Sequence, residues 1–213
     1  MRKFALISCL ATFTLFAQAQ QIIGIDIPGL HNNDGKGIYD QVIHSVSNER
    51  IILMTPARAV NAYESCVDCC ISPANKNPDF YNYGAGHIVS KPMFTAKIYI
   101  FSKPGEAAIS DVALLSGKKV GARKGMPYGD NLESSGARFM RVDKLSQNIK
   151  KLERGRLDYI IAYTPDIYDV FDSMEKSPFP HVASSPVASH EDSLLCKDTP
   201  ENRALIEKLN SAI

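Results

Sequence analysis

Hydrophobic and polar positions along the chain follow two patterns, one typical of strands and one typical of helices, and the two patterns alternate. Short continuous apolar runs are typical of strands buried in a parallel sheet. Between these runs, apolar residues recur every three or four positions, as Ile38, Val42 and Val46 do, which indicates a helix. The first predicted elements are a strand at 21–27, a helix at 37–47, a strand at 50–54, a helix at 56–65 with Thr55 as N-cap, and a strand starting at 67. This order predicts a parallel sheet with helices on its faces.

The same alternation starts again after about 100 residues. A strand at 97–103 ends at Pro104 and Gly105, which break the pattern. The elements predicted after it are a short helix capped by Ser110 or Asp111, a strand at 118–122, a turn at 125–128 into another helix, a helix from Leu145 closed by Gly155, and a strand at 157–163. A repeated pattern of this kind predicts two lobes of similar build.

The stretch 67–80 is an apolar strand that leads into a polar loop containing Pro73 and Pro78. In open α/β sheets, ligands bind just beyond the carboxyl ends of buried strands. The loop from Ser72 to Phe80, which includes Asn75, is therefore predicted to form one wall of a ligand cleft.

The N-terminus has the pattern of a secretory signal peptide. Arg2 and Lys3 precede an apolar run at 4–16, and a small-x-small cleavage site ends at Ala19. The run is shorter than the roughly 20 residues of a membrane-spanning helix. We therefore expect cleavage near Ala19 and a periplasmic location. Loss of residues 1–19 changes the formal charge from +1 to −1, and such a near-neutral chain offers no basic face for nucleic acid.

Four cysteines remain in the predicted mature chain: Cys66, Cys69, Cys70 and Cys196. A zinc site would need a second ligand pair at comparable spacing, and the histidines are scattered singly, so no metal or other cofactor is expected. Buried thiols in a strand are the favoured interpretation, because free cysteine is among the most buried residue types. A Cys66 to Cys196 disulfide stays open as an alternative.

Several ordered motifs resemble bacterial extracellular solute-binding proteins of family 3. The first-lobe motifs are Gly37-Ile38-Tyr39-Asp40, then Pro56-Ala57-Arg58-Ala59 through Asp68, and Val89-Ser90-Lys91-Pro92-Met93. The second-lobe motifs are Leu115 to Ala122 with Lys124-Gly125, and Leu152 to Asp158; the segment from Asp198 to Leu209 resembles the returning C-terminal helix. The resemblance covers nearly the whole mature chain in the right order. Each motif is weak alone, and the ordered set is fairly specific.

The resemblance implies a type II periplasmic binding protein fold, in which two α/β lobes close on a solute. Each lobe would be a mostly parallel sheet flanked by helices, and two hinge strands near 98–103 and 184–193 would join the lobes. Lobe 1 would comprise 20–100 plus 192–213, and lobe 2 would comprise 101–191. The resemblance also makes a monomer the default.

This sequence departs from the family at three ligand-contact positions. By the resemblance, Phe80 stands where amino-acid-binding members carry a carboxylate-binding arginine. Met126 and Pro127 replace a serine or threonine at a helix N-terminus, and Tyr163 replaces an ammonium-binding aspartate. A standard α-amino acid is therefore not the expected ligand. With Tyr128, and with Tyr81 and Tyr83 nearby, these residues favour flat apolar walls for a ring-bearing or weakly charged solute, although aromatic side chains also build cores.

Two arginines complete the predicted ligand-binding set. Arg58 follows Pro56 at a helix start, and Arg123 precedes Lys124 at a strand end. Either guanidinium is suited to a carboxylate or phosphate, although arginine is mostly a solvated surface residue. The full predicted set is Arg58, Ser72, Asn75, Phe80, Arg123, Met126, Tyr128 and Tyr163.

No catalytic constellation is found in the sequence, so an enzyme is not expected. Two Ser-x-x-Lys matches, at Ser116 and Ser173, lack their companion motifs. The expected function is capture of a small solute by hinge closure for an inner-membrane ABC permease. Two alternatives stay open: a periplasmic receptor that docks onto a membrane-bound sensor, and a scaffold that binds no solute.

Overall fold

The computed structural model describes residues 21–213. The predicted signal peptide at 1–19 lies outside these residues. Within the described range, we find no helix whose length and apolar character would suffice to span a membrane.

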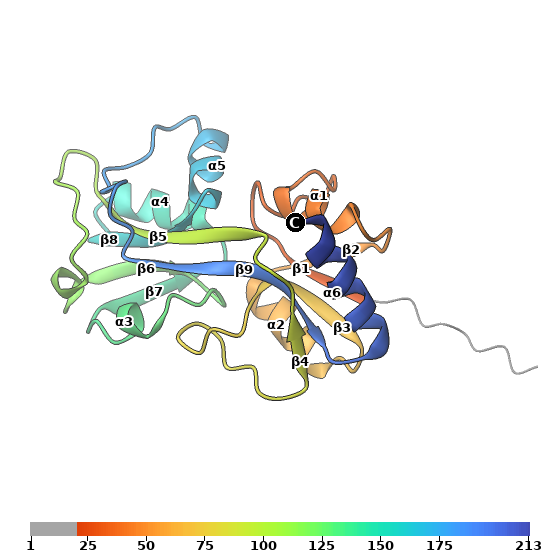
Figure 1. Cartoon of the computed structure of the whole chain (residues 1–213). Coiled ribbons are helices and arrows are strands. Elements are labelled where there is room, and N and C mark those ends of the chain that lie inside the picture. Colours follow the sequence, from red (N-terminus) through yellow and green to blue (C-terminus); the bar gives the residue numbers. More distant parts are fainter. Residues whose placement is uncertain (1–20) are drawn as a thin grey trace, which may run out of the picture.

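The first part of the chain builds a small sheet covered by helices (Figure 1). Its parallel strands are β1 (Gln21–Ile25), β2 (Ile51–Met54) and β3 (Cys69–Ala74), with β1 between the other two. Its helices are α1 (Ile38–His44), α2 (Pro56–Ser65) and the C-terminal α6 (Pro200–Ala212). The short strand β4 (His87–Val89) pairs antiparallel with the end of a later strand. We call this part the first half.

The second half has a similar build. Its parallel strands are β6 (Lys119–Arg123), β7 (Arg138–Val142) and β8 (Tyr159–Thr164), with β6 between the other two. Its helical elements are the 3-10 turn η1 (Val112–Leu115), α3 (Asp130–Glu133), α4 (Leu145–Glu153) and α5 (Asp166–Ser173). The Asp111 carboxylate accepts the N–H of Ala113 and so caps η1.

Two long antiparallel strands connect the halves. β5 (Phe94–Ser102) and β9 (Ala188–Lys197) pair with each other, β5 also pairs with β8, and β9 also pairs with β3. The strand order is therefore β2-β1-β3-β9-β5-β8-β6-β7, a single curled sheet shared by both halves. Figure 1 shows β5 and β9 running side by side from one half to the other.

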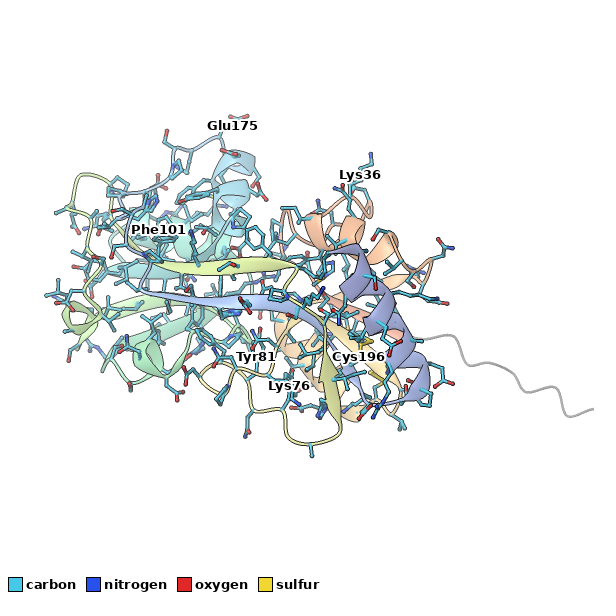
Figure 2. The ribbon with its side chains drawn as sticks, in the orientation of Figure 1. Lys36, Lys76, Tyr81, Phe101, Glu175 and Cys196 are labelled. Carbon is cyan, nitrogen blue, oxygen red and sulfur yellow. A yellow bond between two sulfur atoms is a disulfide. The ribbon has the colours of Figure 1, made fainter. Side chains whose placement is uncertain are left out.

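Each half has apolar side chains packed between its sheet and its helices. In the first half, Ile22 and Leu194 of the sheet pack with Ile43 of α1 and Leu209 of α6. In the second, Phe101 and Ile160 pack with Ile149 of α4 and Phe171 of α5. Figure 2 places Phe101 in the second half, Cys196 in the first, and Tyr81 between them. The helices thus fix the outer faces of the sheet, and the carboxyl ends of β1, β3 and β6 meet between the halves.

The predicted alternation of strands and helices is confirmed, with ends shifted by a few residues. The helix expected at 37–47 spans Ile38–His44, and the strand expected at 97–103 is the longer β5. Strands β4 and β7 were not predicted. The proposed lobe boundaries at 100/101 and 191/192 stay a prediction, and both fall inside the connecting strands β5 and β9.

The expectation of buried free thiols is wrong for this structure. Cys66 is joined to Cys69, and Cys70 is joined to Cys196. Cys70 and Cys196 are directly opposite in the antiparallel β3–β9 pair, with Cα atoms 3.9 Å apart, so Cys196 has Cys70 as its partner and not Cys66. Cys70 and Cys196 are 126 positions apart in the sequence, so their spacing alone does not predict that they form a disulfide.

Candidate functional site

A cavity of about 410 Å³ lies between the halves. The first half contributes residues from β1, α2 and β3, including the charged Glu64 of α2, together with the aromatic loop after β3, and the second half contributes the loop after β6 and one residue of β7. The lining residues are Ile25, Val60, Glu64, Ile71, Pro73, Phe80, Tyr81, Asn82, Tyr83, Gly125, Met126, Pro127 and Arg141. We call this the aromatic cavity.

Close backbone contacts hold the two sides of the aromatic cavity together. Gly125 has φ +79°, and a Cβ atom there would collide with the backbone of Ala57 at the start of α2. Gly129 has φ +84°, and a Cβ there would lie 3.0 Å from the ring of Phe80. Glycine tolerates both the positive φ and the close approach. The loop after β6 therefore sits directly against the first half.

The wall formed by the loop after β3 is built from stacked rings. Phe80 packs on His190 of β9 with ring centroids 4.3 Å apart, and Tyr81 stacks on Tyr83 with centroids 5.8 Å apart. Burial lowers the pKa of His190 to about 4, so its imidazole is neutral at pH 7. Burial likewise raises the pKa of the Tyr81 phenol, with a contribution from Asp192. The wall is thus flat and uncharged, with a phenol hydroxyl available for hydrogen bonding.

A chain of hydrogen bonds crosses between the halves beside this wall. The Asn75 amide Nδ2 donates to His190 Nδ1 at 3.1 Å, and His190 Nε2 lies 3.0 Å from the Tyr163 hydroxyl. The Tyr163 hydroxyl donates to the carbonyl of Pro127 in the loop after β6. Because Tyr163 gives its proton to Pro127, His190 must donate from Nε2, which leaves Nδ1 as the acceptor for Asn75. The chain fixes the tautomer of His190 and joins the two sides of the cavity.

Ser72, His31 and Asp40 form a second buried chain. His31 Nε2 lies 2.9 Å from Ser72 Oγ, and His31 Nδ1 lies 2.6 Å from Asp40 Oδ1. Burial opposes ionisation of Asp40, but hydrogen bonds from His31 and from the N–H groups of Asn32 and Gly37 lower its pKa overall. The connectivity is that of a nucleophilic triad. Ser72 is fully buried, however, and it lies between Ile71 and Pro73, whose side chains line the cavity on the other face of β3.

We expect Ser72→Ala to lower the free energy of unfolding by about 1–3 kcal/mol, because it leaves a buried ring nitrogen of His31 without its partner. The matched control is Ser102→Ala. Ser102 is equally buried, but its Oγ has no hydrogen-bond partner among residues 21–213, so this change should be neutral or stabilising. Urea unfolding of both variants measures the difference. Equal losses for the two serines would contradict a structural role for the His31 chain.

Three buried charged groups near the meeting point of the halves have unpaired atoms. Arg123 Nη1 and Asp166 Oδ1 have no hydrogen-bond partner within the described part of the chain, and Asp192 Oδ1 makes no hydrogen bond there but lies 3.3 Å from His190 Nδ1. Burial raises the pKa values of Asp166 and Asp192 to about 7, although the nearby Arg123 lowers that of Asp166 and a hydrogen bond from Tyr39 lowers that of Asp192. No group of three or more His, Cys, Asp or Glu side chains in 21–213 is placed to hold a metal ion.

The structure brings only part of the predicted ligand-binding set to the aromatic cavity. Phe80 and Met126 line it. Tyr128 and Tyr163 are buried beneath it, stacked with ring centroids 5.6 Å apart, and the Tyr128 hydroxyl accepts the N–H of Arg123. Asn75 supports its wall through His190, and Ser72 lies on the far face of β3. Arg58 is exposed on α2 and lines none of the described cavities, and Arg123 lines a separate, smaller one.

Other lining residues were missed by the sequence analysis. Arg141 lies on β7, a strand that was not predicted, and its Nη2 atom donates to both carboxylate oxygens of Glu133, at 2.6 and 2.8 Å. His190 lies on β9, where only a crossing segment was expected. Val60 and Glu64 could have been found, because they follow one another at helical spacing on the predicted helix at 56–65.

Comparisons with known proteins support the fold. No protein-family model matches the chain, and no curated protein matches it in sequence. Among solved structures, it is similar to the GluR0 ligand-binding core in complex with L-glutamate, with a TM-score of 0.75 and 15% identity over 92% of each chain. It is also similar to a mutant of the arginine-binding protein ArgBP from T. maritima, with a TM-score of 0.69 and 16% identity over 91% of this chain and 87% of that one.

A third similar structure is the substrate-binding protein of an amino acid ABC transporter, with a TM-score of 0.63 and 13% identity over 90% of each chain. At these identities the likeness concerns the fold. The curled mixed sheet with flanking helices is the type II periplasmic binding protein fold, as the resemblance implied.

Proposed function

We propose that this protein binds a small solute with a flat, weakly charged ring in the aromatic cavity. The observation that carries the proposal is the lining of that cavity, in which most of the residues around about 410 Å³ are apolar or aromatic, with Glu64 and Arg141 as the charged members. A volume of this size lies within the range of small-molecule sites. The fold supports the proposal, because ligands of open α/β sheets bind where the carboxyl ends of strands meet.

The chemistry of the wall argues against a standard α-amino acid. Phe80 occupies the wall where family resemblance would place a carboxylate-binding arginine, and it is packed against His190. Arg141, the one arginine that lines the cavity, is already paired with Glu133. Of the similar proteins named above, the GluR0 core is in complex with L-glutamate and ArgBP is an arginine-binding protein, so this chain would differ from these two in ligand class.

The protein would act in the periplasm as a monomer and pass the solute to an inner-membrane ABC permease. Similarity to a substrate-binding protein of an ABC transporter supports this role. The permease partner is tested by a pull-down in which the solute-bound protein is used to capture an inner-membrane permease.

The test is a thermal-shift panel of amino acids, polyamines, aromatic acids, nucleosides and sugars. We expect ring-bearing compounds to raise the melting temperature by roughly 5–10 °C at 100 times Kd, and arginine and glutamate to leave it unchanged. Val60→Phe should reduce the shift, because Val60 lines the cavity and the larger ring takes up part of its volume.

Val67→Phe is the matched control, because Val67 is 87% exposed and lies outside the cavity. It should keep the wild-type response. A strong shift with a plain amino acid would refute the proposed ligand class, and the absence of any shift would refute solute binding and favour the scaffold alternative.

A further inference from the structure

The two charged side chains of the aromatic cavity differ in their surroundings. Arg141 of β7 has its charge balanced by the protein, because its Nη2 atom donates to both carboxylate oxygens of Glu133. Glu64 of α2 is exposed at the cavity and forms no ion pair with any residue in 21–213. The net charge of the cavity is therefore negative, and it comes from a single unbalanced carboxylate.

The end of α2 adds to this negative potential. Helix α2 spans Pro56–Ser65, so Glu64 lies in its last turn, and no basic residue is present in that turn. Backbone dipoles place a partial negative charge at the C-terminus of a helix, which favours a cation there and disfavours a carboxylate. An unpaired glutamate at this end breaks the local preference, and such departures are typical of functional sites. Glu64 and the helix terminus favour the same partner, a positively charged group.

Tyrosine rings stand beside the Glu64 carboxylate. Tyr81 and Tyr83 stack on one another and line the cavity, and Figure 2 shows Tyr81 between the two halves. The carboxylate acts on this wall, because burial and then the charge of Glu64 raise the pKa of the Tyr83 phenol to about 12. The faces of aromatic rings are electron-rich and attract ammonium groups. A carboxylate beside tyrosine rings is an arrangement suited to an organic cation.

The basic side chains near this wall are engaged elsewhere. Among the described residues that line the cavity, Arg141 is the only basic one, and its guanidinium also lies over the rings of Phe139 and Tyr128, at 5.2 and 5.9 Å from their centroids. Lys197 of β9 places its Nζ 4.6 Å from the centroid of the Tyr63 ring, but neither residue lines the cavity. The position beside Glu64 is therefore open to a cation from the solute.

We propose that the solute of the aromatic cavity carries a positively charged amine, and that Glu64 selects for it. This inference rests on the proposed binding of ring-bearing solutes and narrows that class to cationic amines, against aromatic acids and neutral rings. The ring of the solute packs against Phe80 and Tyr81, and its ammonium group lies near Glu64 and Tyr83. A solute of the same shape without the charge loses both the ion pair and the attraction to the rings.

The test is a charge series of three indole compounds of similar shape: tryptamine, which is cationic at neutral pH, the neutral alcohol tryptophol, and the anion indole-3-acetate. The protein contains no tryptophan, so the fluorescence anisotropy of the indole reports binding directly. We expect tryptamine to bind about 3- to 10-fold more tightly than tryptophol, because an exposed ion pair and a ring face each add a modest attraction. Indole-3-acetate should bind most weakly.

Glu64→Gln should remove most of the preference for tryptamine and leave the binding of tryptophol unchanged, because the amide has a similar size and no charge. The variant should fold, since Glu64 is exposed and forms no ion pair within 21–213. Asp79→Asn is the matched control. It removes an exposed carboxylate from the loop after β3 that does not line the cavity, so the wild-type preference should remain.

The outcomes separate this inference from the proposed function. Equal affinities of the wild type for tryptamine and tryptophol, or a preference that Glu64→Gln leaves intact, would overturn the role of Glu64 while ring binding stands. Tightest binding of indole-3-acetate would also overturn it and would assign recognition to Arg141. If none of the three compounds binds, the proposed binding of ring-bearing solutes fails, and the selection of amines fails with it.

Discussion

Replacing Cys70 and Cys196 together with alanine is expected to lower the free energy of unfolding by about 5 kcal/mol, since their disulfide closes a long loop of the unfolded chain. The two residues are 126 positions apart, are fully buried, and join β3 to β9. At about 2–4 °C per kcal/mol for a chain of this size, the melting temperature should fall by roughly 10–20 °C. Thermal and urea unfolding of the double variant measure the loss.

The matched control is the double replacement of Cys66 and Cys69. Their disulfide spans a separation of three residues, so its loss should cost only about 2 kcal/mol in the same loop-entropy treatment. An equal or larger loss for this control would show that loop closure is not what the Cys70 to Cys196 bond contributes.

Stability is expected to fall as the pH rises from 4 to 7. The pKa values of Asp166 and Asp192 are raised by burial to about 7 in the folded protein, against 3.8 for the ordinary carboxyl, so the folded state binds more protons across this window. Their contribution is fully present below pH 4 and is lost as the pH passes about 7. Each carboxyl contributes a slope of up to about 1.4 kcal/mol per pH unit.

His190 has the opposite effect over part of that range. Burial lowers its pKa from 6.5 to about 4, so between these values the unfolded chain binds one more proton there. Two carboxyl groups against one imidazole leave a net slope of about 1.4 kcal/mol per pH unit between pH 4 and 6.5, with stability decreasing as the pH rises. Urea unfolding at several pH values measures it.

Asp192→Asn should flatten this pH dependence, because the amide cannot ionise. Asp79→Asn is the control, since Asp79 is exposed in the loop after β3, and it should keep the wild-type slope. Asp166→Asn should flatten the pH dependence in the same way. If both Asp192→Asn and Asp166→Asn keep the wild-type slope, the pH dependence of stability arises from other groups.

Much of the fold could be predicted from sequence because it depends on local patterns. Continuous apolar runs such as that of β3, the Thr55-Pro56 start of α2 and the glycine after α4 are short-range signals. Strand β7 was missed because it is an edge strand with exposed residues, including Met140 at 46%, and so has no continuous apolar run. Pairing of Cys70 with Cys196 depends on β3–β9 register, which no local pattern encodes.

The candidate site was less predictable, because its members depend on which side of a strand each residue takes. Phe80 and Met126 were placed in the wall by a family resemblance and do line the cavity. Ser72 lies on β3 and Arg123 at the end of β6, and neither lines the aromatic cavity, because Ser72 points toward His31 and Arg123 toward Asp26. The sequence position of a residue predicts whether it lies near the carboxyl end of a strand. It does not predict which face of the sheet the side chain takes.

The pairing of β3 with β9 also has a consequence for synthesis. Residues 103–187 contain the parallel strands and helices of the second half as one continuous segment, whereas the sheet of the first half needs residues as late as Lys197. Long-range strand pairing is slow because a large loop must close first. During folding, the second half is therefore expected to form before the first, and oxidation of Cys70 with Cys196 would mark the final step of assembly.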